Sequence, residues 1–344
     1  MRMLQKRKIS LSFCLWFSVA ALALPARGSG KKGEIVKAEI TAAGKPAVLW
    51  REPTDISTRN LFYGPGGKEH EPHGSVTFLK EDPDGTNPKI MVRDRDGVKW
   101  KVKLGPEARP ETAATRLVWA AGYFVNEDYF VPSLHVENLP AHLHRGQKYV
   151  SGDGSIANVR MKRYLNGEEK AGNWQWRADP FIGTRELNGL RVLMALLNNW
   201  DLTDENNKVY EENRGERIYM VSDLGSTFGT PGLTWPMSKA RGNVRSYSHS
   251  KFITKVTADT VDVATPRRDS FFFLATPREF FKKLKLRTIG KNIPRDDARW
   301  MGELLGQLSP EQIRAAFRAA GYSPQEVEGF ATVVEHRIAE LQRL

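Results

Sequence analysis

The chain has 344 residues, with 52 Lys or Arg against 40 Asp or Glu, so its formal net charge is +12. This length allows two domains or two lobes around a shared cleft, and ordinary apolar content with nine tryptophans indicates a packed globular protein. A single cysteine excludes an intramolecular disulfide framework and a cysteine-based zinc site. The basic residues form no block interleaved with aromatics, so we expect no nucleic-acid partner.

The first 26 residues have the pattern of a secretory signal peptide. Four basic residues and no acid precede an apolar run from Ile9 to Leu24, and Ala21-Leu22-Ala23 offers a small-residue cleavage site. We therefore expect an exported protein, periplasmic or secreted, that contacts a membrane only if this segment remains as an uncleaved anchor. Cys14 lies within the segment, so the mature protein would have no cysteine and a net charge of +8.

Residues 27–74 are interpreted as a linker and N-terminal extension. A Gly/Ser/Lys-rich stretch at 27–32 is followed by weak alternation at 34–51. The run Gly64-Pro65-Gly66-Gly67 is glycine-rich, but it neither joins two clear strands nor leads into a helix, as a phosphate-binding loop should. We therefore predict a surface loop there.

Three antiparallel strands are predicted next, at 75–80, 89–93 and 98–104, joined by turn-rich segments. The third strand alternates, so its two faces differ in chemistry. One face carries Val98, Trp100, Val102 and Leu104, and the other carries Lys99, Lys101 and Lys103. Three lysines on one face are typical of a solvated surface, and a binding role for one of them is the alternative.

A helix is predicted from Pro110 to Gly122, with Glu111 as its only acid. An acid in the first turn also simply complements the helix dipole. Two strands are expected within 123–136, and an apolar helix capped by Asp179 is expected to end near Leu197. The C-terminal third reads as helical, with Ser-Pro starts at 309 and 323.

The stretch from Asn198 to Gly229 carries the chemistry. Asp201 and Asn206 are five positions apart, just after the apolar helix. Two short strands follow, at 208–211 and 217–222, and the second ends in Asp223-Leu224-Gly225. An acidic loop and a hairpin on a solvated surface would be the simplest interpretation of these residues alone.

Taken in order, these elements resemble the protein-kinase-like superfamily, in which D-x4-N supplies a base and a metal ligand and D-x-G supplies a second ligand. The similarity is to atypical branches such as the HipA-type kinases and the phosphoinositide lipid kinases, because Asn199-Trp200 stand where His-Arg is usual and Leu224 replaces Phe. The resemblance implies an α+β, bilobal fold. An antiparallel-sheet N-lobe would occupy 75–137, and a mostly helical C-lobe would occupy 138–344, with the hinge near 137–139.

The resemblance also assigns the site. Lys103, paired with Glu111 or with Glu107 as a second choice, would hold the phosphates of ATP, although Lys101 departs from the small or apolar residue usual over the adenine. Asp201 would be the base, and Mg²⁺ would be bound by Asn206 and Asp223, with Asn207 as an alternative to Asn206. The short phosphate-contacting loop would use the following residues: Gly85, Thr86, Asn87 and Lys89.

The implied reaction is phosphoryl transfer from Mg²⁺-ATP to an unidentified hydroxyl acceptor, so a nucleotide and that acceptor are the expected partners. The basic segment at 229–250 would dock an acidic substrate, or it is a solvated loop. Its cations, with one just beyond it, are Lys239, Arg241, Arg245 and Lys251. Two alternatives stay open: a catalytically inactive binding or scaffolding module, and nucleotidyl or another transfer at the same metal site.

Overall fold

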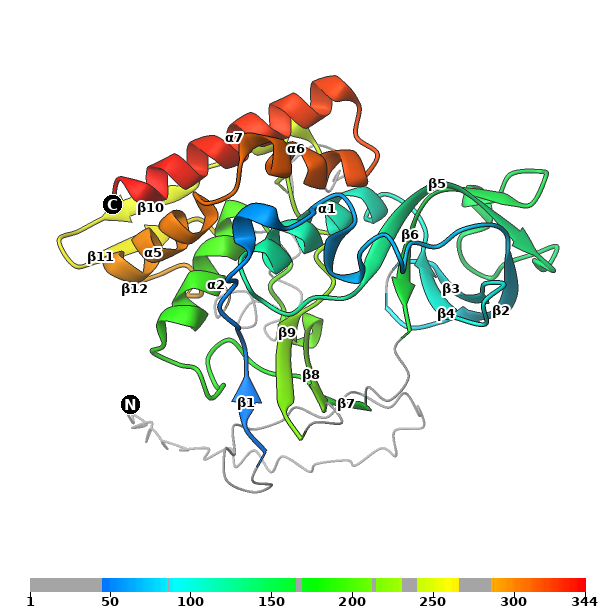
Figure 1. Ribbon diagram of the computed structural model, residues 1–344, viewed down its shortest axis with the longest axis horizontal. Helices are drawn as coiled ribbons and strands as arrows, with labels where there is room; N and C mark the ends of the chain where they lie inside the picture. The colour runs from blue at the N-terminus through cyan, green and yellow to red at the C-terminus, as the bar shows by residue number, and fades with distance from the viewer. Residues whose placement is uncertain are drawn as a thin grey trace, which may run out of the picture. The chain divides into compact units, whose positions relative to one another are not determined.

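The structure is a computed structural model, which divides into two compact units, 1–32 and 33–344. It describes residues 45–85, 87–164, 169–211, 215–230, 240–265, 286 and 288–344, all in the second unit. The predicted signal peptide and the start of the linker therefore lie outside the described residues. Among the described helices, none combines the length and the apolar character needed to cross a membrane. Both helices and strands are present, as the predicted α+β class requires (Figure 1).

Five strands form a closed barrel: β2 (Val76–Asp82), β3 (Lys89–Arg93), β4 (Lys99–Lys103), β5 (Asp128–Glu137) and β6 (Ser155–Arg163). Their order around the barrel is β2-β3-β4-β6-β5, and a parallel pairing of β2 with β5 closes it. The three predicted strands are β2, β3 and β4. The predicted antiparallel sheet is thus part of a barrel, because β5 and β6 add two further strands and one parallel contact.

Alternation along these strands builds the interior of the barrel. Inward side chains form one hydrophobic cluster whose members are buried, and each such burial stabilises the fold by about 1.5–3 kcal/mol. This cluster includes Ile90, Val92, Trp100, Val102, Val159 and Met161. Trp100 anchors it further, because its indole nitrogen donates a hydrogen bond to Asp94 Oδ2 in the β3–β4 turn. The apolar face predicted for the third strand is therefore the inner face.

The barrel extends beyond the predicted boundary at 137–138. Residues 137–139 lie at the end of β5 and in the turn after it, and the chain then returns as β6, which pairs with both β5 and β4. The chain leaves the barrel only after Arg163. The predicted hinge residues therefore precede a further barrel strand, because the segment around Met161, which the sequence pattern left undefined, is β6.

Helix α1 (Ala108–Ala120) follows β4 directly and packs against β5, β6 and the C-terminal helix α6 (Pro310–Ala319). Helix α2 (Arg185–Leu196) is the predicted apolar helix, but its N-cap is Thr184, whose hydroxyl accepts a hydrogen bond from the Leu187 amide. The predicted cap, Asp179, instead accepts from the Phe181 amide in the preceding turn.

A second sheet has the order β1-β9-β8-β7. Its strands are β1 (Ala47–Val48), β7 (Glu169–Gly172), β8 (Asn207–Glu211) and β9 (Arg217–Val221). The β8–β9 pair is the predicted hairpin, with Asn207 opposite Val221. The parallel contact of β1 with β9 attaches the N-terminal extension to this sheet.

The remaining elements are helices and a sheet of order β10-β11-β12, and a second hydrophobic cluster joins them to α1 and α2. They are α3 (Val244–Ser248), β10 (Ile253–Val256), β11 (Thr260–Val263), β12 (Ile293–Pro294), α5 (Arg295–Leu305) and α7 (Pro324–Gln342). Helices α6 and α7 begin with complete capping boxes at Ser309 and Ser323, as the two Ser-Pro starts predict. The Phe317 and Phe330 rings stack between these helices with centroids 4.9 Å apart.

Candidate active site

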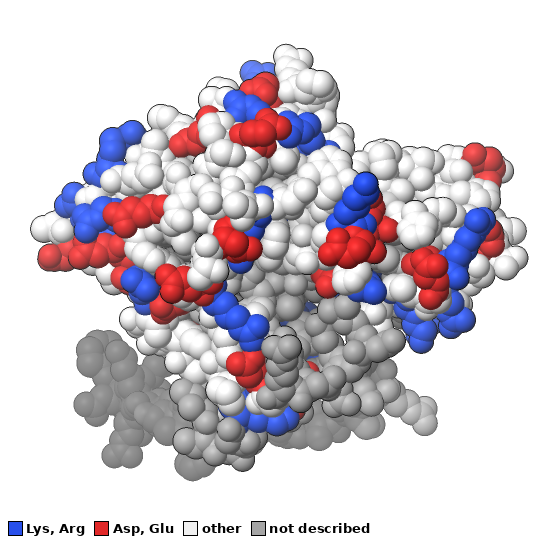
Figure 2. Space-filling view, in the orientation of Figure 1, with Lys and Arg blue, Asp and Glu red and all other residues white. Residues whose placement is uncertain are grey.

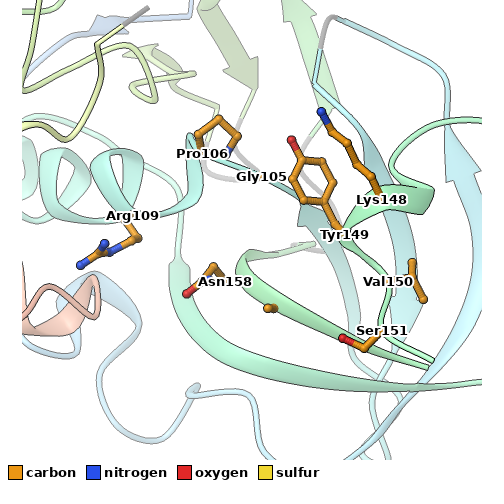
Figure 3. A pocket seen from close by; sticks show the side chains of 9 residues that line it. Gly105, Pro106, Arg109, Lys148, Tyr149, Val150, Ser151 and Asn158 are labelled. Atoms are coloured by element: carbon orange, nitrogen blue, oxygen red, sulfur yellow. The ribbon is translucent and has the colours of Figure 1, made fainter. Parts of the chain in front are cut away.

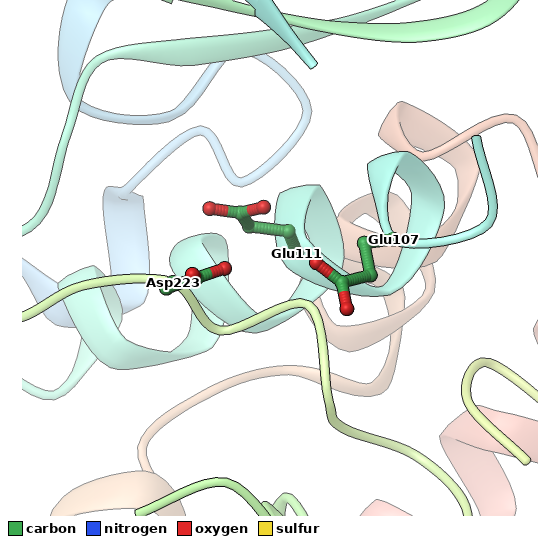
Figure 4. Close-up of side chains that lie close together, drawn as sticks. All are labelled: Glu107, Glu111 and Asp223. Atoms are coloured by element: carbon green, nitrogen blue, oxygen red, sulfur yellow. The ribbon is translucent and has the colours of Figure 1, made fainter. Parts of the chain in front are cut away.

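Three carboxylates converge on the lysine that ends strand β4. Lys103 is almost fully buried, and its Nζ lies 2.7 Å from Glu111 Oε2 and 2.5 Å from Asp223 Oδ1. Glu107 Oε2, one turn earlier on the same side of α1, is 3.3 Å from Nζ. Figure 4 shows Glu107 and Glu111 reaching from the start of α1 toward Asp223 on the loop after β9. The structure thus brings together residues that are 120 positions apart.

The charges in this cluster stabilise one another. Burial opposes the charged form of Lys103, but the carboxylates of Glu111 and Asp223 outweigh it and raise the lysine's pKa. Burial likewise opposes the charged form of Asp223, and Lys103 nonetheless holds the pKa of that carboxyl below its usual value. Lys103 and Asp223 are therefore both ionised at neutral pH.

Asp223 is the exposed member of the cluster. Its side chain is 40% accessible, whereas those of Lys103 and Glu111 are 2% and 3% accessible. The Asp223 backbone has a φ of +60°, which is uncommon for a residue other than glycine and is found mainly where the surrounding structure enforces it. This conformation directs a charged group to a position that solvent or a ligand can reach.

Glu111 has two cationic partners rather than one. Arg160 of β6 donates from Nη2 to Glu111 Oε1 at 2.9 Å, and both side chains are buried. Arg160 stands opposite Lys103 in the β4–β6 ladder, so the two cations approach the same carboxylate from neighbouring strands. Arg160 is not among the predicted site residues, because the sequence pattern leaves β6 undefined; the alternation of Arg160 with Lys162 is the signal that the sequence offers.

Glu107 connects three separate segments. It accepts hydrogen bonds from the Asn87 side-chain amide of the β2–β3 loop and from Arg241 of the segment after the D-x-G motif, in addition to Lys103. Gly225 lies so close that a Cβ there would be 2.6 Å from the Glu107 Cβ. The D-x-G glycine is therefore required for the close approach of this loop to α1.

The D-x4-N loop lies beside the D-x-G loop. The Ser222 amide and hydroxyl both donate to the Asn206 carbonyl, at 3.0 and 2.7 Å, which holds Asn206 next to the start of the D-x-G motif. The Asn206 side chain donates in turn to the Asp201 carbonyl at 2.8 Å. Asn207 is different: its side chain is buried and donates to the Trp174 carbonyl, so the structure does not bring it to the cluster.

The predicted phosphate-contacting loop is only partly described. Gly85 has a φ of +71°, a conformation that glycine adopts without strain. Thr86 lies outside the described residues, and Asn87 contacts Glu107 as stated above. Lys89 donates to the Asp84 carbonyl at 3.0 Å and is opposite Lys103 in the β3–β4 ladder.

The carboxylates of Glu107, Glu111 and Asp223 offer oxygens within 4.8 Å of one another, a spacing that a metal ion could use. The Lys103 ammonium contacts all three, however, and Arg160 and Arg241 pair with the two glutamates. Asp223 is the accessible carboxylate of the three, and the Ser222 contacts hold the Asn206 backbone beside the start of its loop. Carboxylate and amide oxygens are suitable ligands for Mg²⁺.

The basic segment after Gly229 has only a partial description. Lys239 is outside the described residues, whereas Arg241 is bound to Glu107 and lies with its guanidinium 5.4 Å from the Trp200 ring. Arg245 and Lys251 are exposed. A role in docking an acidic substrate remains a prediction for these two residues.

A cavity of about 460 Å³ lies on the other side of the α1 start, between Gly105 and the loop at 148–151. Figure 3 shows Tyr149 and Lys148 on one wall and Arg109 directed away from the space. The Arg109 guanidinium lies 4.0 Å from the Tyr322 ring and pairs with Glu326, so it is already engaged. This cavity does not include the carboxylate cluster.

No family model and no curated protein matches the chain. Among solved structures, the proinflammatory kinase CtkA of Helicobacter pylori is similar with 13% identity and a TM-score of 0.43, over 78% of this chain and 98% of that chain. An apo pseudokinase is similar with 14% identity and a TM-score of 0.19, over 93% of this chain and 99% of that chain. Neither likeness is strong enough to define a family.

Proposed function

We propose that the chain is a kinase-like protein that transfers a phosphoryl group from Mg²⁺-ATP to a hydroxyl. The observation that carries the proposal is the contact of Lys103 with both Glu111 and Asp223. A strand lysine, a helix glutamate and a D-x-G aspartate come from three distant segments, and protein kinases use the same three kinds of residue. The resemblance to atypical branches and the bilobal arrangement, with the barrel as one lobe, belong to the same proposal.

The residues present fit a magnesium ion. Asp223 offers an accessible carboxylate, and the hydrogen bond from Asn206 Nδ2 to the Asp201 carbonyl leaves the Asn206 side-chain oxygen as its acceptor. When bound, Mg²⁺ would neutralise charge on the transferring phosphate. Asn206 and Asp223 would hold it; Asn207, the alternative ligand, is buried, and its amide nitrogen donates to the Trp174 carbonyl.

The other residues bind and orient the substrates. Lys103 is kept cationic by its carboxylates and would contact phosphate oxygens, while Glu111 fixes the direction of its ammonium. Asp201 would accept the proton of the attacking hydroxyl. Asn87, Lys103 and Arg241 now bind Glu107, and the same three donors are suitable for anionic oxygens of a bound nucleotide.

Nucleotide binding and transfer separate the assigned roles. ATP at 100 times its dissociation constant should stabilise the wild type by about 2.7 kcal/mol, and omission of Mg²⁺ should reduce this shift. Asp223→Ala should weaken Mg²⁺-dependent binding. Asp201→Asn should retain binding while turnover falls by at least 100-fold, since an amide cannot accept the hydroxyl proton.

Thermal shift and phosphate transfer to candidate hydroxyl acceptors measure the two effects. Asp259→Asn, an exposed aspartate distant in sequence from both motifs, is the matched control for the Asp201 substitution. Unchanged binding and transfer in both active-site variants would refute the catalytic assignment. Absence of nucleotide binding by the wild type would favour the inactive binding module.

Export remains part of the proposal. It rests on the basic start, apolar run and small-residue site within residues 1–26. The mass of the protein recovered outside the cytoplasm should correspond to a start near Leu24 to Arg27. Recovery of only the full-length chain from the cytoplasm would contradict it.

A further inference from the structure

The outer face of the barrel is basic over three adjacent strands. The inner residues of β3, β4 and β6 are apolar, and the alternating positions face outward, toward α1 and the D-x-G loop. Where these strands pair with one another, and counting the residue that follows β6, seven of nine outward positions are Lys or Arg. The nine are Lys89, Met91, Arg93, Lys99, Lys101, Lys103, Arg160, Lys162 and Tyr164.

The strand register places like charges directly opposite each other. Four cross-strand pairs are basic on both sides, and opposed like charges in a sheet are destabilising. These pairs are Lys89 with Lys103, Arg93 with Lys99, Lys101 with Lys162, and Lys103 with Arg160. Carboxylates neutralise some of these positive charges. Asp82, for example, forms an ion pair with Lys101 at 2.8 Å. Within the described part of the chain, Lys89, Arg93 and Lys99 make no ion pair with a carboxylate.

A cavity of about 460 Å³ opens over the end of this face, a size suited to a small-molecule ligand. Its walls include the ion-pair-free Arg93 and Lys99, together with Lys101 and Met91. Acidic residues at 81, 82 and 84 also line it, but Asp82 is already paired with Lys101. Figure 2 shows Lys and Arg side chains gathered at the lower edge of the barrel, on the right of the view.

The β8–β9 hairpin brings further cations close to the basic face. Lys162 of β6, opposite Lys101 in the middle of the basic face, lies with its Nζ 5.8 Å from the centre of the Tyr210 ring of β8. On the same strand, Lys208 is close enough to Lys89 and Asp223 to interact with both charges. Burial and the neighbouring Lys170 lower the pKa of Lys208 to about 8, a cost that a bound anion would relieve.

We propose that this basic face binds a small molecule with several phosphoryl groups, with one end near Lys103 and Asp223 and the other near Arg93 and Lys99. Along β4 these two ends are about 14 Å apart, because four residues separate Lys99 from Lys103 at about 3.4 Å each. A phosphorylated ligand would also account for Lys101, which stands where a small or apolar residue usually lies over the adenine ring of ATP. The inference goes beyond the proposed function, since binding does not require transfer. A linear polyphosphate and a multiply phosphorylated ring share this chemistry.

Titration calorimetry with inorganic tripolyphosphate and with inositol hexakisphosphate tests the proposal on the full chain at 150 mM salt. The double variant Arg93→Met/Lys99→Met removes two cations that make no ion pair, so the fold should be retained. We expect at least tenfold weaker binding of whichever probe binds, because each lost contact to a charged ligand is worth roughly a factor of ten. Thermal unfolding without ligand should be unchanged or raised, since an opposed like-charge pair is removed.

The control is Lys148→Met/Lys255→Met, which removes two exposed lysines outside the face. It should weaken binding less than twofold. Binding of either probe, lost only in the Arg93/Lys99 variant, supports the proposal, and the preferred probe identifies a chain or a ring as the ligand type. Equal losses in both variants, no binding of either probe, or tighter binding of an oligonucleotide or of vesicles containing anionic lipid would overturn it.

The same series keeps the two proposals apart. Mg²⁺-ATP binding that needs Asp223 but is indifferent to Arg93 and Lys99, with no competition by either probe, would refute this inference and leave the proposed function intact. Probe binding that needs Arg93 and Lys99, in a protein that neither binds nor uses ATP, would refute the proposed function alone.

Discussion

Two buried ion clusters flank helix α1, and they are built differently. Arg116 and Asp128 have side chains that are each 1% exposed, and every oxygen of the aspartate is engaged: Arg116 contacts Oδ1 and the carbonyl, and Thr115 contacts Oδ2. The Lys103 cluster is also buried at Lys103 and Glu111, but it opens to solvent at Asp223. The first cluster is closed, and the second has one charged group that a ligand can reach.

This difference separates a structural ion pair from a candidate site. Burial of a charge is costly in both cases, and complete pairing compensates it in the first. In the Lys103 cluster, part of the negative charge that offsets the buried ammonium comes from Asp223, which is accessible and could also bind a ligand. Substitutions in the closed cluster should therefore affect folding, whereas those in the open cluster should affect mainly binding.

The largest stability effect is expected from Asp128→Ala, which leaves the Arg116 guanidinium buried without its carboxylate. Removal of one partner from a buried pair typically costs about 3–5 kcal/mol. Burial raises the pKa of Asp128 to about 6 despite the opposing effect of Arg116, so the measurement belongs at pH 8, where the carboxyl is ionised. Urea denaturation gives the free energy of unfolding.

Asp153→Ala is the control for this prediction, because Asp153 is exposed at the β5–β6 turn. It should cost less than about 0.5 kcal/mol, as most surface substitutions do. Similar losses in the two variants would show that the closed cluster is not a stability element, and the comparison with the Lys103 cluster would fail.

Lys103→Met should have a smaller effect on folding and a larger one on nucleotide binding. We expect a loss of about 1–3 kcal/mol at pH 7, because Glu111 keeps Arg160 and Asp223 can be solvated. The pH dependence follows from Asp223, whose pKa Lys103 lowers. A depressed carboxyl pKa stabilises the fold above the unfolded pKa, and this contribution is lost as the pH falls.

The difference in unfolding free energy between wild type and Lys103→Met should therefore shrink below about pH 4, near the usual pKa of aspartate. Lys99→Met, on the same face of β4 but exposed and without an ion pair, provides the matched control. A difference that is constant from pH 3 to pH 7 would mean that Lys103 does not stabilise the charge of Asp223.

The sequence predicted the parts of this arrangement that depend on local pattern. The three strands from 75 to 104, the hairpin after Asn206 and the two capping boxes follow from alternation, turn residues and cap chemistry, and the structure contains each of them. The convergence of Lys103 with Asp223 came from family resemblance, since no local signal connects residues 120 positions apart.

Other features could not be predicted in this way. Closure of the barrel depends on the β2–β5 and β4–β6 pairings, which are long-range, and the weak pattern around Met161 concealed β6 and with it Arg160. The sequence does not show which of the adjacent Asn206 and Asn207 faces the D-x-G loop. In the structure β8 begins at Asn207, and the side chain of this residue lies in the core, where it donates to the Trp174 carbonyl. Asp179 resembled a helix cap, but Thr184 lies nearer the first helical turn.

Asp179 provides the smallest and most specific test of the comparison, since it is a buried carboxyl that forms no ion pair within the described part of the chain. Burial raises that pKa to about 6, although the hydrogen bond from the Phe181 amide opposes the shift, and Oδ2 has no hydrogen-bond partner in the described part of the chain. The folded state therefore holds a proton more strongly than the unfolded chain. Between about pH 4 and pH 6 it binds more protons than the unfolded state does, so Asp179 lowers stability as the pH rises through that window.

Asp179→Asn removes the charge and keeps the acceptor for the Phe181 amide. Its amide nitrogen would be a buried donor without a partner, so the absolute stability of the variant is set by two opposing terms. Measuring the unfolding free energy at several pH values isolates the effect of the charge. Relative to wild type, the variant should gain about 1–3 kcal/mol between pH 4 and pH 8, because the wild type loses stability as the buried Asp179 ionises. Asp96→Asn, at an exposed turn, corrects for general effects of the substitution. If the two variants show the same pH profile, Asp179 is solvated in the folded protein, and pairing with a cation is not what distinguishes it from Asp128.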